Sequence, residues 1–125
     1  MIPINELVRG FKLYQDEYEK KVLEVLRSGW YVLGKEVENF EKEFADALGE
    51  NVYSAGVDNR LDAILLGLMA AGIKEGDEVI VQANGYIATM LGVMQCGATP
   101  VFVEPDEYYQ LDVNNIETAM TDKTK

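Results

Sequence analysis

The stretch VYSAGVDNRLDAILL, residues 52–66, decides the fold that the sequence predicts. It starts as a short, partly apolar segment closed by a glycine, and it continues with the apolar spacing of a helix. The same order returns in EVIVQANGYIATMLGVMQ, residues 78–95, and TPVFV, residues 99–103, forms another short apolar run. Strands that alternate with helices in this way form parallel sheets with right-handed crossovers. We therefore expect an α/β fold, mainly a parallel sheet flanked by helices, with strands over 52–56, 78–81 and 99–103.

Apolar residues at helical spacing mark the rest of the chain. The expected helices cover residues 11–27, 35–48, 61–71 and 87–95, with a final helix through Ile116 and Met120 capped by Asp112 or Asn114. A glycine closely follows each of the first four, as is common at helix ends. We expect two parts: a helical segment over residues 1–50, and the first, incomplete part of an α/β domain over residues 51–125.

The helix start at residues 58–60 is the first candidate binding site. Asp58 and Asn59 are residue types that cap helices well, and the free backbone N–H groups of Arg60 and Leu61 could bind an anion there. A plain capping loop that only joins strand to helix explains this pattern equally well.

Tyr86 is the second candidate, because it places an aromatic ring at the next strand-to-helix turn. Ligands of doubly wound sheets bind at the carboxyl ends of the strands, where both turns would lie. Gly85 permits a ligand to approach closely. The alternative is a tyrosine that simply packs in the core.

Trp30 and Tyr31 lie between Gly29 and Gly34, in a turn rather than on a helix face. Such a loop could line a substrate entrance or a subunit interface. A hydrophobic plug between two helices is an equally good interpretation.

Composition excludes several classes of function. The chain has 125 residues, a net charge of −11, no histidine and the single cysteine Cys96. The acidic balance argues against nucleic acid and anionic membranes as partners. Without histidine there is no Ser-His-Asp or Cys-His catalysis and no ordinary zinc site, and no metal site is predicted. One cysteine allows no intrachain disulfide and fits a reducing cytoplasm, and we expect neither a signal peptide nor a membrane span.

Five motifs follow one another in a recognisable order. They are SGWYVLGKEV with FE (residues 28–37 and 40–41), NRLDA (59–63), GDEVIV (76–81), YIAT (86–89) and GATPVFV (97–103). Together they resemble the PLP-dependent nucleotide-sugar aminotransferases, the DegT/DnrJ type of fold type I. The resemblance covers nearly the whole chain, so we expect the N-terminal portion of such an enzyme, with residues 51–125 as the first part of its PLP-binding large domain.

The resemblance implies a cofactor, a reaction and site residues. The cofactor would be pyridoxal 5′-phosphate (PLP), with its phosphate at Asn59, Arg60 and Leu61 and its ring on Tyr86. Trp30 and Tyr31 would contact substrate. The family transfers an amino group, usually from glutamate, to a nucleotide-linked keto-sugar, as a cytoplasmic homodimer, and the product feeds surface polysaccharide or a glycosylated metabolite.

Two features qualify what the resemblance implies. The family usually has a small residue where Arg60 stands. The Arg60 side chain could add a charge-assisted bond to the phosphate, its bulk could push the loop away, or it could point to solvent; we expect it to point to solvent. The lysine that bonds the cofactor covalently lies downstream of Lys125 in the family, so no catalytic residue is expected here and this chain alone should be inactive. The alternatives are a non-catalytic fragment and another α/β nucleotide-binding domain, the latter weakened by the lack of a Walker loop or a Gly-x-Gly-x-x-Gly motif.

Overall fold

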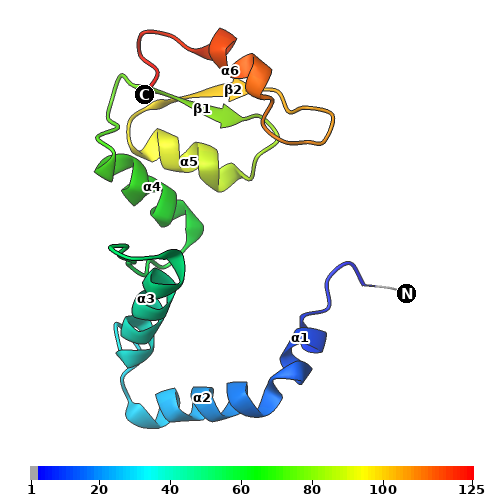
Figure 1. The fold of residues 1–125 in the computed structure, drawn as a ribbon, viewed down its shortest axis with the longest axis vertical. Coiled ribbons are helices and arrows are strands. Elements are labelled where there is room, and N and C mark those ends of the chain that lie inside the picture. The colour runs from blue at the N-terminus through cyan, green and yellow to red at the C-terminus, as the bar shows by residue number, and fades with distance from the viewer. Residues whose placement is uncertain (1–2) are drawn as a thin grey trace. The chain divides into compact units, whose positions relative to one another are not determined.

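The computed structural model describes residues 3–125 (Figure 1). Contacts between residues divide the chain into two compact units, a first unit that ends at Gly56 and a second unit of Val57–Lys125. Each unit is described by itself.

The first unit consists of α1 (Leu7–Leu13), α2 (Gln15–Ser28) and α3 (Lys35–Leu48). The single helix predicted over residues 11–27 is therefore wrong, since Tyr14, with φ −130°, separates α1 from α2. Asp16 and Glu17 lie in the first turn of α2, where acidic side chains stabilise the positive end of the helix dipole and favour a new helix start. The predicted helix over residues 35–48 is confirmed.

Aromatic side chains line the helices of the first unit without forming a core. The rings of Phe11 and Tyr18 stack with centroids 5.9 Å apart, and those of Phe40 and Phe44 with centroids 5.6 Å apart. All four side chains are exposed, and among the described residues of this unit only Gly34 and Ala45 are buried. Packing within the unit thus leaves its apolar helix faces open.

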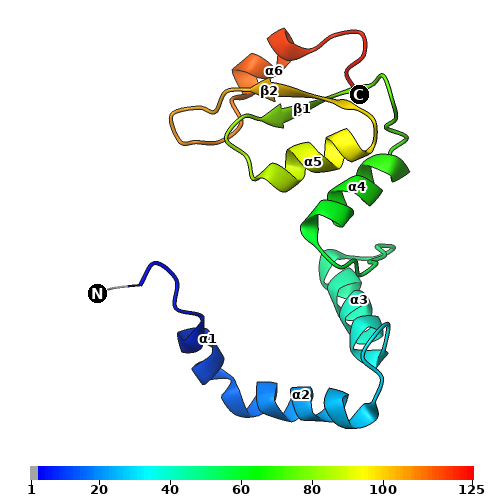
Figure 2. The same ribbon diagram turned by 180° about the vertical axis from the view of Figure 1, so that it is seen from behind.

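The second unit contains α4 (Arg60–Ala70), β1 (Glu78–Gln82), α5 (Ile87–Gln95), β2 (Thr99–Val103) and α6 (Val113–Ala119). The two strands pair in parallel, with Ile80 opposite Val101. The helix α5 is the crossover between them, and it lies on one side of the strands while α6 lies on the other, as both ribbon views show (Figures 1 and 2). The expected α/β fold with parallel strands and flanking helices is confirmed.

The core of the second unit lies between α5 and the strands. Val81 from β1, Val93 from α5 and Ala98 are buried together, and Leu68 of α4 packs against them half-buried. The helices α4 and α5 approach closely at Gly92, where an added Cβ would stand 2.6 Å from Cγ2 of Ile64. This close contact holds the two helices, and the turns that precede them, near each other.

The strand predicted over residues 52–56 is wrong. Residues 52–57 have no regular secondary structure, because none of the residues 3–125 pairs with them as a strand. The Gly56 N–H instead donates to Oε1 of Glu41 at 2.6 Å.

The other edge of β1 makes a short parallel pairing with the end of the chain. Glu78 N–H donates to the Lys123 carbonyl at 2.9 Å, and Lys125 N–H donates to the Glu78 carbonyl at 3.0 Å. Thr124 thereby forms an isolated parallel bridge to Glu78. Among the described residues, no helix is long and apolar enough to cross a membrane.

Candidate functional site

The first candidate site is the N-terminus of α4, which the capping residue Asn59 organises. Asn59 Oδ1 accepts a hydrogen bond from the Asp62 backbone N–H at 3.0 Å, as an N-cap residue does for the third helical position. Within residues 3–125, the N–H groups of Arg60 and Leu61 donate to no protein acceptor. The start of an 11-residue helix therefore presents two free N–H groups together with the positive end of its dipole.

Two carboxylates flank the same turn. The Asn59 Nδ2 amide donates to Oδ2 of Asp58 at 3.1 Å and to Oδ2 of Asp62 at 2.9 Å. The interaction between the two carboxyl groups raises the pKa of Asp62 above its ordinary value and lowers the pKa of Asp58.

The side chain of Arg60 links the start of α4 to the start of α5. Its guanidinium carbon lies 5.9 Å from the ring centroid of Tyr86, over the ring, and Nη2 lies 3.5 Å from Oγ1 of Thr89. The side chain is exposed, as predicted, but its charged end lies against these two residues. Thr89 was not among the candidate site residues, because only the packing of α4 on α5 brings it near Arg60.

Tyr86 stands at the second strand-to-helix turn and caps α5 through its backbone. Its carbonyl accepts a hydrogen bond from the Thr89 N–H at 2.9 Å, while its side chain is 67% exposed. The exposure contradicts the alternative in which Tyr86 is a buried core residue. The Arg60 guanidinium lies over one face of the ring, and the side chain is accessible to a planar ligand.

Polar side chains fix the loop beside this turn, among them Gln82, which sequence reasoning missed. Gln82 Nε2, at the end of β1, donates to the Tyr109 carbonyl at 2.7 Å and also contacts Oδ1 of Asn84. Asp106 Oδ1 accepts from the N–H groups of Tyr108 and Gln110, both at 2.9 Å. The loop after β2 is thus held at the carboxyl end of β1.

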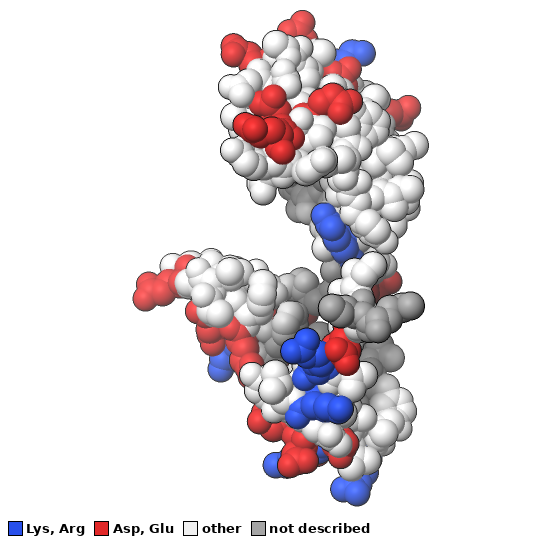
Figure 3. All heavy atoms as spheres, turned by 90° about the vertical axis from the view of Figure 1, so that its right-hand side faces the viewer, with Lys and Arg blue, Asp and Glu red and all other residues white. Residues whose placement is uncertain are grey.

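The second unit is strongly acidic. It carries 11 of the 22 acidic residues but only four of the 11 basic ones, and acidic side chains predominate on the face of this unit that Figure 3 presents. Arg60 is the only basic residue between Val57 and Ile73. Among residues 3–125 no group of three potential metal ligands gathers, so no metal centre is indicated there.

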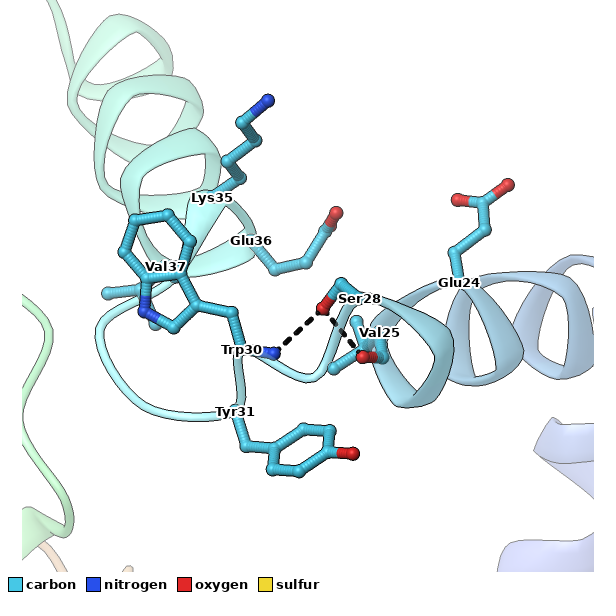
Figure 4. A pocket seen from close by; sticks show the side chains of 9 residues that line it. Glu24, Val25, Ser28, Trp30, Tyr31, Lys35, Glu36 and Val37 are labelled. Atoms are coloured by element: carbon cyan, nitrogen blue, oxygen red, sulfur yellow. Dashed lines mark hydrogen bonds between the residues drawn. The ribbon is translucent and has the colours of Figure 1, made fainter.

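Trp30 and Tyr31, the predicted substrate-contacting residues, lie in the loop between α2 and α3. Trp30 Nε1 donates to the Val32 carbonyl at 2.7 Å, and the Tyr31 hydroxyl donates to the Leu26 carbonyl at 3.1 Å. The indole lies toward the start of α3, whereas Tyr31 points to the opposite side of the loop (Figure 4). Both side chains are more than half exposed, so the plug interpretation, in which they would be buried between the helices, does not fit.

An open pocket of about 430 Å³ lies beside this loop. Its lining includes Glu24, Ser28, Lys35 and Glu36 as well as the two aromatic residues. Gly34 packs closely here, since an added Cβ would stand 3.2 Å from the Trp30 carbonyl oxygen. The first unit therefore offers aromatic and charged groups around one concave surface.

Comparison with known proteins places the chain in a family. Residues 13–125 match the family model described as the DegT/DnrJ/EryC1/StrS aminotransferase family. The chain belongs to this family. The resemblance inferred from the five motifs is thereby confirmed.

Several relatives in the family are sugar transaminases. The chain is 47% identical to dTDP-3-amino-3,6-dideoxy-alpha-D-galactopyranose transaminase of Aneurinibacillus thermoaerophilus, with 100% of the chain and 34% of that protein covered. It is 42% identical to dTDP-3-amino-3,4,6-trideoxy-alpha-D-glucose transaminase of Streptomyces venezuelae, covering 99% of the chain and 33% of the relative. The chain thus spans about a third of the length of the curated relatives that it matches.

Solved structures of the family share the fold. The S. venezuelae DesV structure in complex with a ketimine intermediate matches with a TM-score of 0.90 at 42% identity, over 99% of this chain and 33% of that one. The Bacillus subtilis NtdA structure with bound cofactor PMP matches with a TM-score of 0.79 at 36% identity, over 88% of this chain and 26% of that one. The expected fold type is therefore confirmed for this N-terminal portion.

Proposed function

We propose that this chain is the N-terminal portion of a PLP-dependent aminotransferase that acts on a nucleotide-linked keto-sugar. The observation that carries the proposal is the pair of free N–H groups at the start of α4, next to an exposed aromatic ring at the start of α5. The first feature suits a phosphate and the second suits a planar aromatic ring. Membership of an aminotransferase family supports the same assignment.

The described residues fit the cofactor. In this proposal the N–H groups of Arg60 and Leu61 bind the phosphate, Asn59 fixes the helix start by capping it, and Tyr86 stacks on the pyridine ring. The B. subtilis relative whose structure holds PMP supports this cofactor. When bound, PLP would supply a pyridine ring that acts as an electron sink, and it would carry an amino group from one substrate to another.

In this proposal the amino donor is an amino acid, glutamate as in the family, and the acceptor is a nucleotide-linked keto-sugar. The names of the two curated relatives, both transaminases of dTDP-linked sugars, support the nucleotide-sugar class. In the first unit, Trp30 and Tyr31 flank a pocket that also contains Lys35, the one cation in its lining. We assign these aromatic residues to substrate contact, where they would pack against apolar parts of the sugar or base.

The remaining assignments concern assembly and place. Residues 51–125 are the first part of the cofactor domain, and residues 1–50 are the helical segment that precedes it. The full-length protein is proposed to be a homodimer of the cytoplasm. Exposed apolar side chains on α2 and α3 support burial of these faces in the complete assembly.

The test uses the full-length protein that contains this chain. Purified with PLP, it should show the visible absorbance of a protein-bound cofactor and should transfer the amino group of glutamate to a dTDP-linked 3-keto sugar. The 125-residue chain, treated in parallel with PLP and borohydride, should gain no specific pyridoxyl adduct. A full-length protein that neither binds PLP nor transfers the amino group would refute the proposal.

A further inference from the structure

Arg60 is held at the point where the two candidate binding features meet. It is the first residue of α4, and its guanidinium lies over the Tyr86 ring at 5.9 Å from the centroid and 3.5 Å from Oγ1 of Thr89. Close packing of α4 on α5 at Gly92 sets the separation of these residues. The charged group therefore stands near both the free N–H groups and the aromatic ring.

These two contacts hold the guanidinium weakly. Tyr86 is mostly exposed, so a cation over its ring is still solvated and gains little. Thr89 offers a neutral acceptor at the outer limit of hydrogen-bond distance. A phosphate dianion at the helix start would be a stronger partner, because charge-assisted bonds to phosphate are shorter and stronger and an arginine can make two of them at once.

The carboxylates of this turn also favour a cation nearby. Asp58 and Asp62 flank Arg60 within one helical turn, and both carboxylates accept from the same Asn59 amide. An anion at this helix start meets their repulsion within the range of electrostatic interactions in physiological salt. Arg60 is the only basic residue between Val57 and Ile73 that can offset it.

We propose that Arg60 is a mobile phosphate clamp, whose guanidinium rests on Tyr86 and Thr89 and moves to the cofactor phosphate when the cofactor binds. This inference rests on the proposed function, since it requires PLP at this site. The movement has two effects: it neutralises the repulsion from the two aspartates, and it uncovers the face of Tyr86 for the pyridine ring.

The test separates phosphate from ring by using two ligands that form no covalent bond with the protein. The full-length protein, freed of cofactor, is titrated calorimetrically with pyridoxine 5′-phosphate and with pyridoxine. Arg60→Gln should weaken binding of pyridoxine 5′-phosphate roughly tenfold to a hundredfold, the effect of one charge-assisted bond. Binding of pyridoxine should not weaken, since the variant loses no contact to the ring and no longer covers Tyr86.

Lys74→Gln is the matched control. It also removes one positive charge from the second unit, but Lys74 follows the C-terminal end of α4, whereas Arg60 lies at its N-terminal end. It should leave both affinities unchanged. If wild type and Arg60→Gln bind pyridoxine 5′-phosphate with equal affinity, the clamp is overturned and the proposed function stays intact. The same conclusion follows if Arg60→Gln loses equal affinity for pyridoxine 5′-phosphate and for pyridoxine. A wild-type protein that binds neither pyridoxine 5′-phosphate nor PLP would overturn the clamp and the proposed function together.

Discussion

The two units of the chain differ in how large a buried core each of them forms. The second unit buries Val81, Val93 and Ala98 together in a core between helix and sheet, whereas the first unit buries only Gly34 and Ala45 among its described residues. Candidate residues in the two units depend on different forces as a result. The geometry around Arg60 and Tyr86 is fixed by packing of α4 on α5, while Trp30 and Tyr31 are fixed by hydrogen bonds within one loop.

The sharpest test of this difference is to place the same charge in each unit. Val93 is 1% exposed and Val22 on α2 is 56% exposed. In the 125-residue chain, Val93→Asp should cost about 3–5 kcal/mol, because it buries a carboxylate with no partner. Val22→Asp should change stability by less than about 0.5 kcal/mol, since its side chain is in water. Urea unfolding followed by circular dichroism measures both, and similar costs for the two variants would contradict the comparison.

A smaller effect tests the close approach of α4 and α5. Gly92→Ala would force a Cβ to within 2.6 Å of Ile64 and should destabilise the second unit by about 1–3 kcal/mol. The control is Gly67→Ala in α4, where no atom lies within 4 Å of the added Cβ. That variant should gain roughly 0.5–1 kcal/mol from reduced backbone entropy. Thermal unfolding that shifts in the same direction for both would refute the proposed role of Gly92.

Tyr86 presents the exposed aromatic ring of the candidate site in the second unit. In the full-length protein, Tyr86→Ala should lose about 0.5–1.5 kcal/mol of PLP affinity, which is up to roughly tenfold, through loss of stacking. Tyr86→Phe should retain PLP, since the ring remains. Titration of the cofactor-free variants with PLP makes the comparison. Unchanged affinity in a folded Tyr86→Ala variant would show that the ring does not contact the cofactor.

The smallest expected effect lies in the titration of the aspartate pair. The raised pKa of Asp62 gives a contribution to stability that is present at low pH and is lost as pH rises through its folded-state pKa. The lowered pKa of Asp58 has the opposite sign, and its contribution is lost as pH falls through its folded-state pKa. In Asp58→Asn, the pKa of Asp62 should fall toward its ordinary value, as carboxyl NMR shifts would show. Asp106→Asn is the control and should leave the pKa of Asp62 unchanged. A pKa of Asp62 that does not move in Asp58→Asn would contradict the interaction between the two carboxyl groups.

Local signals in the sequence predict much of this fold. The helix over 35–48 has glycines on both sides, and the helix over 87–95 and the strand over 99–103 have the predicted bounds, because turn residues and apolar periodicity delimit them. Asn59 and Asp112 cap helices as their residue types suggest. The predicted strand over 52–56 failed because strand formation depends on a partner, which local sequence does not reveal.

The candidate site is predictable to a similar extent. Asn59, Arg60, Leu61 and Tyr86 lie where the pattern of turns places them, at the starts of α4 and α5. The direction of the Arg60 guanidinium was not predictable, because it depends on Thr89, which is 29 residues away in sequence. Likewise, the contact of Gln82 with Tyr109 spans 27 residues and arises only when the loop after β2 folds back.

The pairing of Glu78 with residues 123–125 has a consequence for how a sheet can grow on this chain. The backbone N–H of Glu78 bonds to Lys123 and its carbonyl bonds to Lys125. These bonds at one residue fix the register of any segment that continues the pairing along β1. Beyond Glu78 the same edge of β1 has no further partner among the described residues, and unpaired edges of apolar strands attract foreign strands. A strand that pairs along this edge would remove a site of aggregation, and its register would be fixed by the bonds at Glu78.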